Sequence, residues 1–298
     1  MDFLTLLTKV KNKFIFLLIF QCFFTSFAFA KTIKKHDVAI CAIFQNEAPY
    51  LKEWIEFHRL VGVKHFYLFN HLSNDHYEAI LKSYIRSGVV QLIDWPYEPS
   101  EVNSWNTIQC DAYNYALKLA KGKVKWLAVL DVDEFLFPVE VNTLSEFLLD
   151  YKNEVGISVN WQMYGTSNVE TIMPGHLMIE DLVLKAPFDY NENIHVKSIV
   201  RPQYVKNFSD PHHANFKYGH YGVNSNRNIV KTPYSSPVRI DKIRINHYWT
   251  RDEDFFRRCK LPRRQKWLDG AVLERLNNLN AENDPAILKY VPELKKSL

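Results

Sequence analysis

Apolar and polar positions alternate between two patterns from residue 37 onward. Short apolar runs are typical of strands buried on both faces, and segments with apolar residues every three or four positions are typical of amphipathic helices. Strands are expected at residues 38–44, 65–70, 89–93 and 126–130. Helices are expected after the first three, at about residues 47–61, 75–86 and 106–121. The alternation predicts an α/β fold with a mostly parallel central sheet and helices on both faces.

The second half of the chain predicts fewer regular elements. Strands are expected at residues 155–161, 194–200 and 240–246. Residues 203–238 are rich in Pro, Asn, Gly, Ser and His and predict long loops, which are usually functional inside a compact domain. Because no repeat or linker interrupts the pattern, residues 31–298 are expected to form one domain, with a helical extension from about residue 250.

Two helix starts bear on the chemistry. Asn46 is expected to be the N-cap of the helix that follows the first strand. Thr250 and Glu253 have the spacing of a capping box. The acids at 252–254 are therefore interpreted as complementing a helix N-terminus rather than as a metal site.

The N-terminal 30 residues have the pattern of a targeting segment. Lys9, Lys11 and Lys13 precede an apolar run at residues 14–24, and Ala28-Phe29-Ala30 has the small-x-small pattern of a cleavage site. Two interpretations stay open, a cleaved signal peptide and an uncleaved membrane anchor. Since the lysines stay cytoplasmic, both predict that the rest of the chain is exported or membrane-associated.

Charge and cysteine content exclude some classes. Without residues 1–30 the chain carries 34 basic and 32 acidic residues, which is too balanced for a nucleic-acid-binding protein. The three remaining cysteines, Cys41, Cys110 and Cys259, are too few and too far apart for a disulfide framework or a zinc cluster.

Asp131 and Asp133 carry the most informative pattern. They directly follow the apolar strand at residues 126–130, and ligands of such sheets bind at the carboxyl ends of the strands. Two carboxylates at this spacing can both reach one Mg²⁺ or Mn²⁺ ion, which prefer oxygen ligands and share substrate phosphates. A salt-bridged turn is the competing interpretation.

Two other functions share this pattern. An apolar strand followed by Asp-x-Asp also opens the haloacid-dehalogenase phosphatases, in which Asp131 would be the nucleophile. That motif normally opens the catalytic domain, whereas here about 95 residues of α/β pattern precede it. A non-catalytic carbohydrate-binding protein on the same fold is the other alternative.

Six ordered blocks resemble glycosyltransferases of family 92. They lie at residues 41–58, 62–75, 109–113, 131–138, 197–202 and 245–249, so the resemblance covers roughly residues 38–260. It implies a GT-A-type nucleotide-sugar-binding fold and an inverting, metal-dependent transfer of a sugar. The implied donor is a nucleotide sugar, with a UDP-sugar favoured, and the acceptor is a hydroxyl of a glycan or glycoconjugate. The implied cofactor is a divalent metal, Mn²⁺ in preference to Mg²⁺.

The resemblance also assigns residues. Asp131, Asp133 and the imidazole of His247 would bind the metal. Residues that would contact the donor are Asn46, Glu47, Asn70, Asp75, Lys197 and Arg201. Asn70 departs from the acidic residue that the broader superfamily often has at this place, which leaves recognition of the base open. Each of these side chains also has a purely structural interpretation, as a cap, a surface charge or a core histidine.

The catalytic base is less well defined. Glu180 matches an acidic position of the family and is the first candidate, and Asp210 is the second. His212 and His213, in the same loop as Asp210, are further candidates for the site. Six basic residues between 257 and 266 are interpreted as a solvated helix face, with a phosphate or membrane-surface role as the alternative.

Overall fold

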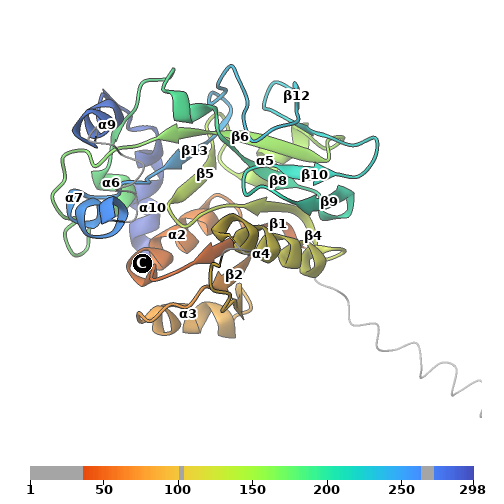
Figure 1. The fold of residues 1–298 in the computed structure, drawn as a ribbon, viewed down its shortest axis with the longest axis horizontal. Coiled ribbons are helices and arrows are strands. Elements are labelled where there is room, and N and C mark those ends of the chain that lie inside the picture. The colour runs from red at the N-terminus through yellow and green to blue at the C-terminus, as the bar shows by residue number, and fades with distance from the viewer. Residues whose placement is uncertain (1–35, 101–103, 263–271) are drawn as a thin grey trace, which may run out of the picture. The chain divides into compact units, whose positions relative to one another are not determined.

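The structure is a computed structural model that describes residues 36–100, 104–262 and 272–298 (Figure 1). Within these ranges, no helix has the length and apolar character needed to cross a membrane. The predicted targeting segment at residues 1–30 lies outside the described residues, so its two interpretations stay predictions. The predicted domain boundaries also stay predictions.

A ten-stranded mixed sheet forms the centre of the described part of the chain. Its first four strands are parallel and hydrogen-bonded in the order β3-β2-β1-β4. Beyond them, β8 runs antiparallel between β4 and β6. The strands of this sheet are β1 His36–Phe44, β2 His65–Asn70, β3 Val90–Asp94, β4 Val124–Val129, β5 Glu134–Pro138, β6 Gly156–Met163, β8 Val196–Val200, β11 Gly222–Val223, β12 Ile229–Val230 and β13 Ile243–His247.

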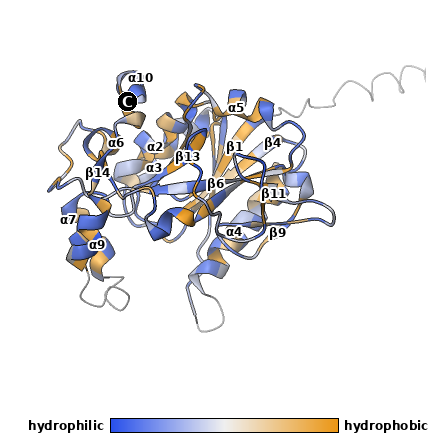
Figure 2. Cartoon of the chain, turned by 90° about the horizontal axis from the view of Figure 1, so that it is seen from above, coloured by the Kyte–Doolittle hydropathy of each residue, from blue (hydrophilic) through white to orange (hydrophobic). Residues whose placement is uncertain are grey.

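Helices cover both faces of this sheet. Residues of β1 therefore alternate between two hydrophobic cores, one on each face. Val38, Ile40 and Phe44 pack with α2, α3 and α5, whereas Ala39 and Cys41 pack with α4. The α-helices are α2 Ala48–Leu60, α3 Tyr77–Arg86, α4 Trp105–Ala120, α5 Leu144–Asp150, α6 Met178–Asp181, α7 Glu253–Phe255, α9 Val272–Leu279 and α10 Val291–Ser297. Figure 2 shows the apolar residues gathered on the central strands and on the helix faces turned toward them. The predicted α/β class with a mostly parallel sheet is confirmed.

Short elements complete the second half. The 3₁₀-helices are Asn191–Ile194, Pro202–Tyr204 and Ala286–Tyr290, and Phe256–Lys260 is a π-helix. Two small antiparallel pairs stand apart from the main sheet, β9 Val205–Phe208 with β10 Ala214–Phe216, and β7 Leu184–Lys185 with β14 Glu282–Asn283. The stretch 203–238 therefore consists of loops and four very short strands, close to the long loops that its composition predicts.

Two helix-cap predictions were wrong. Asn46 is not an N-cap: its φ is 57°, in the left-handed region, and Glu47 occupies the cap position of α2 without a side-chain bond. The cap of α7 is Asp252, whose Oδ1 accepts a bond from Phe255 N at 2.8 Å. Thr250 instead lies close to the carbonyl of Tyr164, at 3.5 Å. The Asn46 side chain instead accepts a bond from Asn74 N in a different loop, and α7 begins at Glu253, so that Asp252 is the cap.

The pairing of β5 with β13 brings the two halves of the chain together. These strands are antiparallel, with Glu134 opposite His247. β13 also runs parallel to the end of β6, with His247 opposite Met163. As a result, the end of β13 lies beside the turn that links β4 to β5.

Candidate active site

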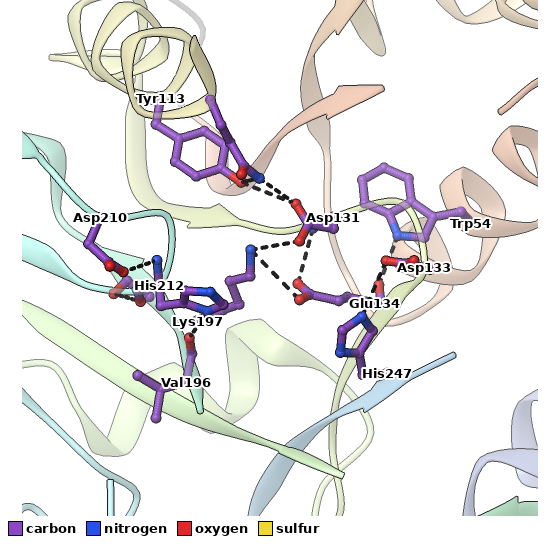
Figure 3. A network of polar contacts seen from close by, with 12 residues as sticks. Trp54, Tyr113, Asp131, Asp133, Glu134, Val196, Lys197, Asp210, His212 and His247 are labelled. Atoms are coloured by element: carbon purple, nitrogen blue, oxygen red, sulfur yellow. Dashed lines mark hydrogen bonds and ion pairs between the residues drawn. The ribbon is translucent and has the colours of Figure 1, made fainter. Parts of the chain in front are cut away.

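The turn between β4 and β5 holds the acidic pair. It is closed by the backbone bond from Glu134 N to Asp131 O at 3.1 Å, and by Glu134 Oε2, which accepts a bond from Asp131 N at 3.0 Å. Trp54 Nε1 of α2 donates to the carbonyl of Glu134 at 2.8 Å and fixes the same turn from the helical side. Asp131 and Asp133 are therefore presented from a rigid turn at the carboxyl end of β4 (Figure 3).

Both oxygens of Asp131 are bound by protein groups. Gln109 Nε2 of α4 donates to Oδ1 at 2.6 Å, and Tyr113 Oη of the next helical turn lies 3.4 Å from the same oxygen. Lys197 Nζ of β8 donates to Oδ2 at 2.9 Å. Burial raises the pKa of Asp131, but the charge and hydrogen bond of Lys197 together with the charge of His247 outweigh burial, so the pKa lies below its usual value. Asp131 is therefore a carboxylate at neutral pH.

Lys197 is a buried cation between two acids, with 1% of its side chain exposed. Its ammonium also lies 3.7 Å from Glu134 Oε1. Burial lowers the pKa of Lys197, but Asp131 and Glu134 outweigh it and raise the pKa above the usual value. The pKa of Glu134, which is completely buried, is raised well above its usual value by burial despite the charge of Lys197. Lys197, which the family resemblance assigns as a donor contact, thus lies against the acidic pair.

Asp133 lies between a lysine and a histidine. Lys260 Nζ donates to Oδ2 at 2.8 Å, and His247 Nε2 is 3.5 Å from Oδ1. Burial raises the pKa of Asp133, but Lys260 and then His247 outweigh burial and hold it well below its usual value. His247 Nδ1 is buried and has no hydrogen-bond partner among the described residues.

Aromatic rings form one wall of this cluster. The indole of Trp161 on β6 lies 4.3 Å from the ring of His247, centroid to centroid, and 5.0 Å from the ring of His212. It also stacks on His195 at 5.0 Å. Burial, followed by the charge of Lys197, lowers the pKa of His212 to about 3, so this ring is neutral. His213 is set apart from this wall, because its ring contacts Phe216 of β10.

A second buried ion pair lies at the start of α2. Arg251, which is completely buried, pairs with Glu47 and has its guanidinium carbon 3.8 Å from the centre of the Tyr50 ring. Two of its nitrogens, Nε and Nη1, have no hydrogen-bond partner among the described residues. Burial raises the pKa of Glu47, while Arg251 lowers it and Asp133 raises it further, which indicates that this pair and Asp133 share one electrostatic environment.

The other predicted donor contacts sit at the ends of β1 and β2. Asn46 Oδ1 accepts a bond from Asn74 N at 2.8 Å, and Asp75 Oδ2 accepts one from Ala48 N at 2.8 Å. Asn70 donates to Asp94 Oδ1 at 3.2 Å. These side chains lie where they were expected, at the carboxyl ends of neighbouring parallel strands, and each one also fixes a loop.

Three predicted residues are not brought to the cluster. Arg201 follows β8, which runs antiparallel to β4, so it lies at the opposite end of the strand from Lys197, with its guanidinium over the ring of Trp126. Glu180 is on α6 and pairs with Lys295 of α10 at 2.6 Å. Asp210 accepts a bond from His212 N at 2.8 Å. Asp210 therefore contacts His212, whose ring belongs to the aromatic wall.

Two functional candidates were missed by sequence reasoning. Lys260 belongs to the basic stretch interpreted as a solvated face, and that interpretation holds for Arg257 and Arg258, which pair with surface acids. The π-helix at Phe256–Lys260 changes the angular phase of the helix, and Lys260 points to Asp133 instead. Such bulges are frequent at functional sites, but nothing in the residue pattern announces one. Arg251 was missed because it lies between Thr250 and Glu253, which were interpreted only as a capping box.

Comparison with known proteins identifies the family. An α/β sheet that presents two carboxylates, a histidine and several cations at the end of one strand is suited to binding an anionic ligand. Residues 34–270 match the model of Glycosyltransferase family 92, so the chain belongs to that family. This membership decides against the phosphatase alternative.

Curated relatives are plant proteins. A family 92 protein of Ricinus communis is 24% identical over 205 residues, which are 66% of this chain and 35% of that protein. One of Arabidopsis thaliana is 27% identical over 200 residues, 62% of this chain and 32% of that protein. The chain thus spans about a third of the length of these relatives.

Solved structures resemble the chain only weakly. Staphylococcus aureus TarS 1–349 with UDP-GlcNAc has a TM-score of 0.37 and 12% identity, and the match covers 68% of this chain and 62% of that one. Mycobacterium tuberculosis glucosyl-3-phosphoglycerate synthase with Mn²⁺, UDP and glucosyl-3-phosphoglycerate has a TM-score of 0.32 and 13% identity, over 57% and 58%.

Proposed function

We propose that this chain is a metal-dependent, inverting glycosyltransferase of the GT-A type that moves a sugar from a UDP-sugar to a hydroxyl of a glycan or glycoconjugate. Family membership supports the reaction class. The observation that carries the proposal is the convergence of Asp131, Asp133 and His247 at one end of the sheet, from strands more than 100 residues apart in sequence.

The residue types suit a hard divalent ion, with Mn²⁺ favoured over Mg²⁺, but the ligand atoms of the three side chains do not all lie within 4.8 Å of one another, so binding an ion requires them to draw together. Two ionised carboxylates and an imidazole are suitable ligands, and the unpartnered Nδ1 shows that the protein does not use the full hydrogen-bonding capacity of His247. Asp131, Asp133 and His247 would hold the ion, which when bound supplies positive charge for a departing diphosphate. Lys260 now holds Asp133 Oδ2, so this ammonium has to give up that oxygen to the ion.

The cations of the site are suited to a diphosphate. Lys197 holds Asp131 in one orientation, and its burial keeps that orientation rigid. Lys260 and Arg251 lie on the other side of Asp133, and Arg251 has unused N–H groups. Preorganised positive charge of this kind stabilises a nucleoside diphosphate as it leaves, because the charge needs no rearrangement when the bond breaks.

Inversion requires a base that accepts the proton of the acceptor hydroxyl as its oxygen attacks the anomeric carbon from the face opposite the diphosphate. Glu180 remains the first candidate and Asp210 the second. The Lys295 hydrogen bond, opposed by burial, lowers the pKa of Glu180, so its carboxylate is in the form that can accept a proton. Glu53 of α2 accepts hydrogen bonds from the N-terminal amides of α6 and so fixes the helix that carries Glu180.

A donor screen tests the proposal. The full chain is incubated with a set of UDP-sugars and mixed glycan acceptors, with Mn²⁺ or with EDTA, and UDP release is measured. We expect Mn²⁺-dependent release with at least one donor, abolished in Asp131→Asn and retained in Asp150→Asn, a matched change at an exposed aspartate. Equal release with EDTA would refute the metal requirement. Binding of glycans without any turnover would favour the non-catalytic alternative.

A further inference from the structure

A surface cavity of about 310 Å³ lies beside α4, on the side away from the acidic cluster. Residues Ile108, Asp111, Tyr115 and Lys118 recur at helical spacing and line it from α4. Trp95 and Tyr97 line it from the segment that follows β3. Gln109 and Tyr113, which reach Asp131, point from another face of the same helix. One helix therefore separates the cavity from the proposed transfer site.

The aromatic rings of this cavity are held in place. Trp95 Nε1 donates to the carbonyl of Ile108 at 3.1 Å, which ties the indole to α4. The ring of Tyr115 lies 5.7 Å from that of Trp95, centroid to centroid. His71 Nε2 donates to the carbonyl of Tyr97 at 2.9 Å and fixes the segment after β3. The walls of the cavity are thus held by contacts within the protein.

Exposure and chemistry point to a particular kind of ligand. Tyr97 is 53% exposed and Tyr115 is 42% exposed, and the ring of each contacts the indole of Trp95. Asp111 and Lys118 are exposed and form no hydrogen bond or ion pair with the described residues. Aromatic faces flanked by one free acceptor and one free donor complement a sugar ring, which has apolar C–H faces and polar hydroxyls around its edge.

We propose that this cavity binds a sugar of the acceptor glycan at a distance from the hydroxyl that receives the transferred sugar. The proposal rests on the proposed function for the identity of the substrate. The volume is at the lower end of the range for small-molecule sites, which suits a short stretch of glycan. Since α4 is about 10 Å wide with its side chains, the sugar in this cavity cannot be the one that is modified. Long acceptors gain affinity from the cavity, and single sugars do not.

Direct binding measurements test this without any donor. The full chain is titrated with cellotetraose, N-acetylchitotetraose, β1,4-galactotetraose and α-mannotetraose, and binding is followed by saturation-transfer NMR and calorimetry. We expect at least one tetrasaccharide to bind, and Tyr115→Ala and Asp111→Ala each to weaken it by about tenfold, the loss of one stacking or polar contact. Tyr218→Ala, at a fully exposed tyrosine outside the cavity, is the matched control and keeps the affinity. A thermal melt of each variant checks that it is folded.

UDP binding in the presence of Mn²⁺ is measured on the same samples. Unchanged UDP affinity in Tyr115→Ala and Asp111→Ala supports the proposal, and a parallel loss overturns it, because the cavity would then serve the nucleotide. If UDP binds but no tetrasaccharide does, or if the two cavity variants bind tetrasaccharide as tightly as the control, the cavity proposal fails while the proposed function stands. If a tetrasaccharide binds in the cavity and UDP does not bind at all, the proposed function fails instead.

Discussion

The buried carboxyl of Glu53 should make the folded protein more stable at low pH than at high pH. This residue of α2 is 7% exposed, and its two oxygens accept bonds from Met178 N at 3.0 Å and Ile179 N at 3.1 Å, at the start of α6. Burial raises the pKa of Glu53 from 4.5 to about 7, although the two backbone bonds lower it. The folded state therefore binds a proton between pH 4.5 and 7 that the unfolded state releases.

The sign and size follow from this difference. A folded-state pKa above the unfolded value means that the contribution is fully present at low pH and is lost as pH rises through about 7. A shift of about 2.5 units corresponds to about 3 kcal/mol of folding free energy. Glu53→Gln cannot ionise, so it lacks this loss. We expect the variant to be less stable than the parent at pH 5, by about 1 kcal/mol for an imperfect amide contact, and more stable at pH 8 by about 2 kcal/mol.

Urea unfolding of the parent and the variant at pH 5, 6, 7 and 8 measures this crossover. Glu274→Gln, at an exposed glutamate, is the control and should give curves parallel to those of the parent. A stability difference between Glu53→Gln and the parent that stays constant from pH 5 to pH 8 would refute the reasoning, because it would show that Glu53 is already ionised at pH 5.

Three further predictions concern the site. Asp133→Asn should abolish transfer and also lower the free energy of unfolding in a urea titration by about 3 kcal/mol, because it leaves the largely buried ammonium of Lys260 without its carboxylate partner. His247→Ala should raise the Mn²⁺ concentration needed for half-maximal UDP release; a lower melting temperature with an unmoved Mn²⁺ curve would instead make it a core histidine. Glu180→Gln should reduce single-turnover transfer by at least about a hundredfold while Asp210→Asn keeps most of it, and the reverse order would exchange their roles.

The parallel half of the fold could be predicted because its signals are local. The strands at residues 38–44 and 65–70 are apolar runs of the right length, and their order in sequence is enough to place Asp131 at a carboxyl end. Strand β5 was not predicted, because its five residues directly follow the acidic turn and share no periodicity with it. The partner that makes β5 a strand is β13, and that pairing is not visible in either segment alone.

Some residues of the candidate site could likewise be predicted from the sequence, and others could not. Asp131 and Asp133 were predicted from their position after a strand, whereas Lys197 was assigned as a donor contact by the family resemblance; in the structure the three lie together. Arg201 directly follows the strand that holds Lys197 and lies about 13 Å further along it, at roughly 3.3 Å per residue, so the antiparallel direction of β8 removes it from the site. Lys260 depends on a π-helix, whose extra residue per turn leaves no trace in the spacing of charged residues.

The pairing of β5 with β13 also has a consequence for the order in which the chain is synthesised. β5 emerges more than 100 residues before the strand that it pairs with, and all five of its residues are buried in the finished fold. Until residues 243–247 leave the ribosome, this apolar edge has no partner, although the parallel strands β1 to β4 can already assemble beside it. Contacts of such long sequence separation form late, and unpaired edges are where nascent chains associate with one another. Chains that terminate before β13 should therefore be insoluble. Full-length chains should need a chaperone until β13 has been synthesised.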